Sequence, residues 1–130
     1  MSLSRVGILL ALLPLASGCA DDPPSIRNLQ YSPNAAIVGM PSTINGMVDY
    51  TDQDNDISQS QIELLTPENV STVSSPTPIM NVGMGVVGMV NYTLMFTPDE
   101  PGNWHFNVWI IDLQGRASNK LNGLLRVSNP

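Results

Sequence analysis

The 130-residue chain has one cysteine, one histidine and five basic residues, and each shortage excludes a class of protein. One thiol cannot close an intramolecular disulfide or build a zinc–thiolate site, so packing must hold the fold together. The single histidine, His105, lies mid-segment with no nucleophile marked beside it, and no catalytic residues are therefore predicted. The basic residues are scattered and the formal net charge is −6. Without a clustered basic footprint, nucleic acid is not an expected partner.

Long apolar runs are also missing, apart from one near the amino terminus. Arg5 is followed by Val6 to Leu15 and then by the small residues Ala16, Ser17 and Gly18. A basic start, a short apolar stretch and small residues before a cut are typical of a secretory signal peptide. The stretch has about ten residues against the roughly 20 of a transmembrane helix. We therefore expect residues 1–18 to be removed.

The segment Leu15-Ala16-Ser17-Gly18-Cys19 resembles the lipobox of bacterial lipoproteins. The resemblance implies that a diacylglyceryl group is added to the Cys19 sulfur, that the chain is cut after Gly18, and that the new amino terminus is acylated. Ala20, in place of an aspartate, implies sorting to the outer membrane. The alternative is an ordinary signal peptide followed by a free cysteine, which would be an odd residue in an oxidising compartment. Residues 19–25 then form a lipidated cysteine and a tether that spans roughly 20 Å.

From residue 26 to residue 130 the apolar residues alternate with a period of two, and turn residues recur every eight to twelve positions. This pattern predicts β-strands, with no amphipathic helix. We expect a loop at 66–78 and a hairpin turn within 80–89. The predicted strands are 26–31, 36–38, 43–50, 59–65, 90–96, 104–111 and 121–127. About seven short strands indicate a single all-β antiparallel sandwich.

Residues 101–118, which begin Pro101-Gly102-Asn103-Trp104 and close with Asp112 and Gly115, resemble the last hairpin of bacterial immunoglobulin-like repeats. Residues 48–57 resemble the acidic turn after the second strand of these domains. The resemblance implies an immunoglobulin-like β-sandwich in which the two acidic loops lie at the same end. Trp104 stands where many of these domains have a tyrosine, so a hydroxyl cannot serve at that corner.

Four aspartates are the candidate metal ligands: Asp52, Asp54, Asp56 and Asp112. Alternating carboxylates suit a hard cation such as calcium, and Asp112 would join the first three if the two loops meet. Ser60 and Glu63 extend the spacing toward that of an EF-hand. However, Ile57 takes the place of the required glycine, and strands flank the loop. The alternative to a calcium site is an acidic turn capped by its own backbone.

Four methionines, Met80, Met84, Met89 and Met95, have irregular spacings. Thioethers bind copper(I), but methionine also fills gaps in apolar packing. We expect these residues to pack in the core or in a hairpin.

These observations predict an outer-membrane lipoprotein held in the membrane by its N-terminal lipid, with acyl chains such as palmitate. Its domain would be a non-catalytic binding, adhesion or envelope-assembly module. One alternative is a calcium-dependent recognition module, for example for a polysaccharide, that uses the 52–56 loop. Another is an accessory subunit that pairs an edge strand with an envelope protein. An exposed aromatic and acidic patch would favour recognition, and an uncovered apolar edge strand would favour assembly. The fold class does not choose among them.

Overall fold

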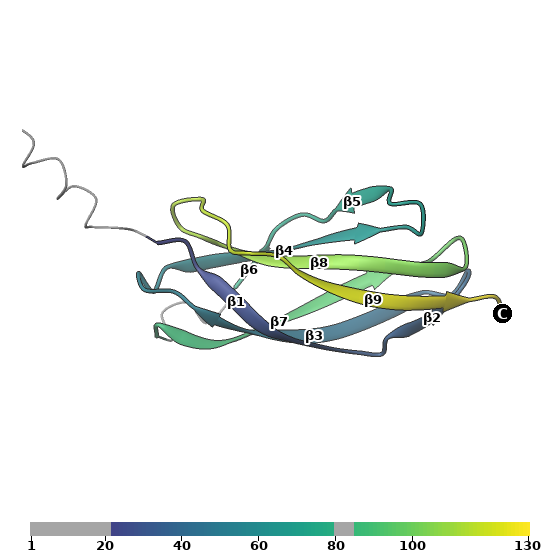
Figure 1. Ribbon diagram of the computed structural model, residues 1–130, viewed down its shortest axis with the longest axis horizontal. Helices are drawn as coiled ribbons and strands as arrows, with labels where there is room; N and C mark the ends of the chain where they lie inside the picture. Colours follow the sequence, from purple (N-terminus) through teal and green to yellow (C-terminus); the bar gives the residue numbers. More distant parts are fainter. Residues whose placement is uncertain (1–21, 80–84) are drawn as a thin grey trace, which may run out of the picture.

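The computed structural model describes residues 22–79 and 85–130, and over this part of the chain it is a two-layer sandwich (Figure 1). One sheet has three strands in the order β1-β3-β7, and the other has six. The three are β1 (Ser25–Ser32), β3 (Ser42–Thr51) and β7 (Val87–Phe96). The second sheet has the order β2-β9-β8-β4-β5, with β6 also paired to β4. Its strands are β2 (Ala35–Ile37), β4 (Ile57–Leu65), β5 (Ser71–Val73), β6 (Thr77–Pro78), β8 (Gly102–Asp112) and β9 (Leu121–Ser128).

All strand pairs are antiparallel except β2 with β9, which are parallel. The predicted all-β antiparallel sandwich is confirmed. Within the described ranges, no helix is long and apolar enough to cross a membrane. The predicted signal peptide (1–18) and Cys19 fall outside these ranges, as do residues 80–84 of the predicted hairpin turn.

The stretch 66–78, expected as a loop, contains the two short strands β5 and β6, so that prediction was wrong in part. β4 ends at one end of the sandwich, whereas β7 begins at the other. The chain must therefore return along the outer edge of β4. The polar Ser, Thr and Pro composition of this stretch hides strand pairing, because its side chains are exposed and show no apolar alternation.

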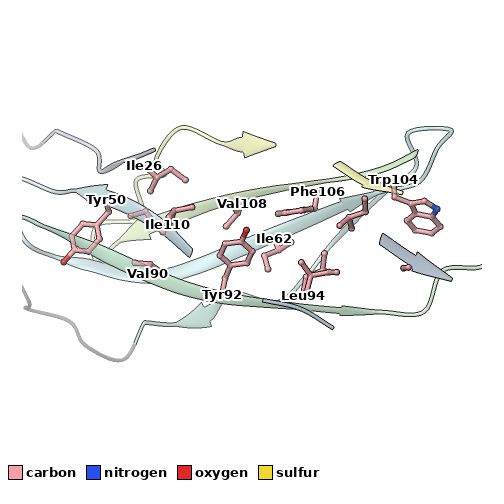
Figure 2. Packing of buried hydrophobic residues seen from close by; sticks show 14 of the residues in the cluster. Ile26, Tyr50, Ile62, Val90, Tyr92, Leu94, Trp104, Phe106, Val108 and Ile110 are labelled. Carbon is pink, nitrogen blue, oxygen red and sulfur yellow. The ribbon is translucent and has the colours of Figure 1, made fainter. Parts of the chain in front are cut away.

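The alternation of β8 builds the centre of the core. Trp104, Phe106, Val108 and Ile110 are all buried and point between the sheets (Figure 2), as their period of two predicts. The ring of Phe106 meets the ring of Tyr31 edge to face, with centroids 5.0 Å apart. These rings join the two sheets, because Tyr31 belongs to β1 and Phe106 to β8.

Two glycines make room for this aromatic cluster. A Cβ atom on Gly46 would come within 2.2 Å of the Tyr92 ring, and one on Gly123 would come within 2.3 Å of the Phe106 ring. Gly46 and Tyr92 are direct partners in the β3–β7 register. The Tyr92 ring therefore lies over bare backbone, where its hydroxyl donates to the Gln30 carbonyl at 3.3 Å.

Trp104 stabilises the corner before β8, where many immunoglobulin-like domains have a tyrosine hydroxyl. Its indole Nε1 donates to the Glu100 carbonyl, four residues upstream, at 3.0 Å. The ring also packs on Phe96, with centroids 5.6 Å apart. The bond fixes the entry of the chain into β8.

Two of the four methionines differ from the expectation, and Met80 and Met84 lie outside the described residues. The side chains of Met89 and Met95 on β7 are 57% and 74% exposed, so the prediction that they pack in the core or in a hairpin was wrong. The buried positions of β7 are Val90, Tyr92 and Leu94. The two methionines have the opposite parity and therefore lie on the outer face.

The two ends of the sandwich carry different loops (Figure 1). The chain enters β1 at the end that also holds the 52–56 and 112–118 loops, where Ser25 pairs with Thr51. There the Asn119 side chain clamps Ile26, accepting from its N–H at 2.8 Å and donating to its carbonyl at 2.9 Å. The opposite end carries the 66–70 and 97–101 loops and the carboxyl terminus. We call these the acidic end and the far end.

We expect the substitution Gly46→Ala to destabilise the fold by about 2 kcal/mol, because overpacking forces Tyr92 off its place on the strand. Urea unfolding of the purified protein measures this change. Asn45→Ala is the control: its side chain is exposed, and the change should cost no more than about 0.5 kcal/mol. Equal midpoints for Gly46→Ala and the parent protein would contradict the predicted overlap.

Candidate functional site

The candidate site is the acidic end, and Asp52 begins it. This residue follows β3 directly and is 1% exposed. Its Oδ1 accepts from the Asp54 N–H at 3.3 Å and its Oδ2 from the Asp56 N–H at 2.7 Å. Its carbonyl accepts from the N–H of Asn55, which has a positive φ of 52°. The loop is thus folded around the carboxylate of its own first residue.

Asp112 does the same for the 112–118 loop at the end of β8. Its Oδ1 accepts from the N–H groups of Gln114 and Arg116 at 2.9 and 2.8 Å. Gly115, with a φ of +84°, donates its N–H to the Asp112 carbonyl at 3.0 Å. Asp and Gly in this spacing are typical of such a turn, because the carboxylate accepts from the backbone and glycine supplies the positive φ.

The two loops meet, as the resemblance to immunoglobulin-like repeats implied. The Leu113 N–H donates to the Asp56 carbonyl at 2.8 Å. Arg116 also joins them, because its Nε lies 3.1 Å from Asp112 Oδ2 and its Nη2 lies 3.2 Å from Asp54 Oδ2. Sequence reasoning missed this role of Arg116. Its position four residues after Asp112 was the available signal for the first contact, but nothing in the sequence indicates the second.

One carboxylate oxygen from each of Asp52, Asp54 and Asp56 lies within 4.8 Å of the other two. This spacing fits three oxygen ligands around one cation. Asp112 does not belong to this group, and its two oxygens accept three hydrogen bonds from its own loop. The further positions of the EF-hand spacing do not converge here. Glu63 instead accepts from Ser71 at 2.5 Å and Asn107 at 3.0 Å.

Asp56 is the least compensated member of the group. Its Oδ1 is buried and has no hydrogen-bond partner within the described residues. Burial raises the pKa of Asp56 from 3.8 to about 6, and a hydrogen bond to Asp52 and the charges of Asp52, Asp112 and Asp54 add to the rise. The folded protein thus favours a proton, or another positive charge, at Asp56.

His105, the sole histidine, lies on β8 away from this end. Its Nδ1 is 3.2 Å from Asn122 Oδ1, in an exposed pair on neighbouring strands. Trp109 on the same strand is 8% exposed, and the Lys120 ammonium lies 4.3 Å from the centre of its ring. The more polar face of β8 is therefore partly covered by the hairpin that follows it.

No family model matches the chain, and no curated protein does. Solved structures match its fold. A PKD domain of an M14-like peptidase from a Thermoplasmatales archaeon is 17% identical, with a TM-score of 0.51 over 83% of this chain and 98% of that one. A superoxide reductase (neelaredoxin) variant from Ignicoccus hospitalis is 9% identical, with a TM-score of 0.50 over 87% and 86%.

A Pseudomonas fluorescens alkylpurine DNA glycosylase bound to DNA is 13% identical, with a TM-score of 0.52 over 79% of this chain. This chain spans only 30% of that enzyme's length. Because these proteins differ in activity and share little sequence, the likeness concerns the fold. The chain is an immunoglobulin-like β-sandwich.

We expect Asp56→Asn, measured with chelator present, to raise the melting temperature at pH 7 by about 3 °C. The folded pKa of Asp56 lies above its unfolded value, so the folded state binds more protons between about pH 4 and pH 6. Stability therefore falls as the pH rises through this window. The gain from the substitution should become small at about pH 3, below the unfolded pKa of 3.8, where Asp56 is mostly protonated in both states. An equal gain at both pH values would contradict this account.

Calcium at the acidic end stays a prediction, and melting curves with about 1 mM calcium and with chelator test it. A ligand present at 100 times its dissociation constant adds about 2.7 kcal/mol, which is several degrees for this domain. We expect Asp54→Asn to abolish the rise. Asp49→Asn, which removes a carboxylate on β3 outside the group, should keep it. No rise in the parent protein would leave an acidic turn capped by its own backbone.

Proposed function

We propose that this chain is a lipid-anchored protein of the bacterial outer membrane whose sandwich is a non-catalytic module for assembly with an envelope protein. The observation that carries the proposal is the exposed strand β7. Three of its outward side chains are apolar, and the strand contains no charged residue. An uncovered apolar edge is the feature that favours assembly over the other readings.

The direction of the chain supports an anchor at the amino terminus. Pro24 is buried against the domain and β1 starts at Ser25. Five residues, 19–23, would then separate the lipid from the fold, a reach of roughly 17 Å. In this arrangement the acidic end faces the membrane, while the far end and the strand edges face other envelope components.

A second candidate is calcium-dependent recognition, favoured by the buried and unpartnered Asp56 Oδ1 beside two further carboxylates. A cation held there would lie near the membrane and could bridge to lipid headgroups. The described surface gives less support to a polysaccharide ligand. Its large exposed apolar side chains are valines, methionines, an isoleucine and a leucine, with no aromatic ring among them.

We expect Cys19→Ser in the full-length chain to abolish incorporation of labelled palmitate and to move the protein from the outer-membrane fraction to the soluble fraction. Stable anchoring needs more than one acyl chain, and without Cys19 there is no attachment point. Ser17→Ala keeps a small residue before the cut and should still be lipidated. A Cys19→Ser protein that stays in the outer membrane would contradict the proposed anchor.

A further inference from the structure

The edge strands of the sandwich are protected in every case but one. β2, β5 and β6 are three residues long or shorter, which leaves little edge to pair with. β1 has a bulge between Arg27 and Gln30, and the Asn119 side chain occupies the outward N–H and carbonyl of Ile26. β7 has ten residues and pairs only with β3 among the described residues. It contains no proline and no charged residue.

The register shows which backbone groups of β7 are free. The Asp52 N–H donates to the Val86 carbonyl at 2.7 Å, which extends the β3–β7 ladder by one pair. In an antiparallel ladder, residues of one parity bond the partner strand and residues of the other parity point away from it. The even residues of β7 therefore bond β3, and the odd ones, centred on Asn91, present their N–H and carbonyl groups at the open edge.

A cleft of 390 Å³ lies beside this edge, between the two sheets. β7 contributes Val90 and Tyr92 to its wall, β4 contributes Ile62, and Ile79 follows β6. The cleft exists because the smaller sheet has three strands against six and does not cover this side of the larger one. A strand added next to β7 would place alternate side chains over the cleft.

We propose that β7 and this cleft bind one extended, uncharged apolar segment of an envelope protein, flanked by basic residues, as an added strand. Main-chain bonds to the odd residues of β7 would give affinity, and the cleft would give specificity for the inward side chains. Basic flanks are expected on the bound segment because acidic residues border β7 at both ends. The Asp52 loop borders the start of β7, and Asp99 and Glu100 follow its end, whereas residues 85–98 carry no charge.

A second copy of this chain fits the site less well for three reasons. Its own β7 side chains already point into its own core, so they would not fill the cleft. The chain has a formal net charge of −6, so two copies repel each other. An antiparallel pair would also put the two amino termini at opposite ends, about 33 Å apart for a ten-residue strand, which does not suit two anchors in one membrane.

The test uses the full chain purified in mild detergent and synthetic ten-residue peptides that alternate valine or leucine with threonine. One peptide carries two lysines at each end, a second carries two glutamates, and a third is a scrambled form of the first. We expect the lysine peptide to bind below 1 mM, and the glutamate peptide to bind about tenfold more weakly at low salt, a difference that shrinks at about 0.5 M salt. No binding of the lysine peptide, or equal binding of the scrambled one, would overturn the inference.

Matched variants of one residue locate the binding edge. Asn91→Pro removes an outward N–H without touching the ladder to β3, and should weaken binding about tenfold. Asn91→Ala keeps the N–H and should bind as the parent does. Hydrogen exchange gives a direct readout, because the amides of residues 89, 91 and 93 should become protected on binding. Protection elsewhere, with these three unchanged, would overturn the inference.

Thr77→Trp tests the cleft without altering β7, should Asn91→Pro fail to fold. Thr77 is exposed and lines the cleft, so a larger side chain there should block the peptide and leave the melting temperature unchanged. A dimer in sedimentation that Asn91→Pro dissolves would instead assign the edge to a second copy. The inference depends on the proposed assembly function. Peptide binding at β7 does not require the lipid anchor, so the Cys19→Ser result and the peptide result can fail separately.

Discussion

The contact between Phe106 of β8 and the two tyrosines Tyr31 and Tyr92 is the one on which the rest of the sandwich depends. It is the place where side chains of the smaller sheet reach the centre of the larger one, with ring centroids 5.0 and 6.0 Å apart. Tyr31 also exchanges hydrogen bonds with the backbone of Leu124, at 2.9 Å each. Without a disulfide, this buried aromatic joint and the apolar faces around it set the distance between the layers.

The two sheets that this joint connects are closed on the β1 side of the sandwich and open on the β7 side. Bonds through Tyr31 tie the β1 side of the small sheet to β9, so this side is closed. The β7 side has no corresponding tie among the described residues, and the cleft opens there. The acidic end depends on the same frame, because β3 and β8 deliver Asp52 and Asp112 to neighbouring loops only when the sheets are held in this register.

The sequence predicts much of this architecture, since alternation reports which residues of a strand face the core. Alternation predicted the strands that contain Trp104 and Val90. The spacing of Asp112 and Gly115 predicted the turn after β8. The same alternation places Met89 and Met95 on the outer face, opposite to Val90, Tyr92 and Leu94, so their exposure could have been predicted. Alternation does not report whether a strand has a neighbour on each side, so the open edge of β7 among the described residues could not be predicted. The contact between Arg116 and Asp54 was missed because it joins loops 62 residues apart.

The entry of the chain at the acidic end also decides how the domain would carry a load. A pull on Pro24 along the long axis acts parallel to β1, whose bonds to β3 run perpendicular to the strand. Such a force loads the bonds of the β1–β3 pair together rather than one after another. The Asn119 clamp on Ile26 lies at the point where the tension enters. A domain held at this end and gripped along β7 is thus connected in shear, the direction in which a pair of β-strands resists separation best.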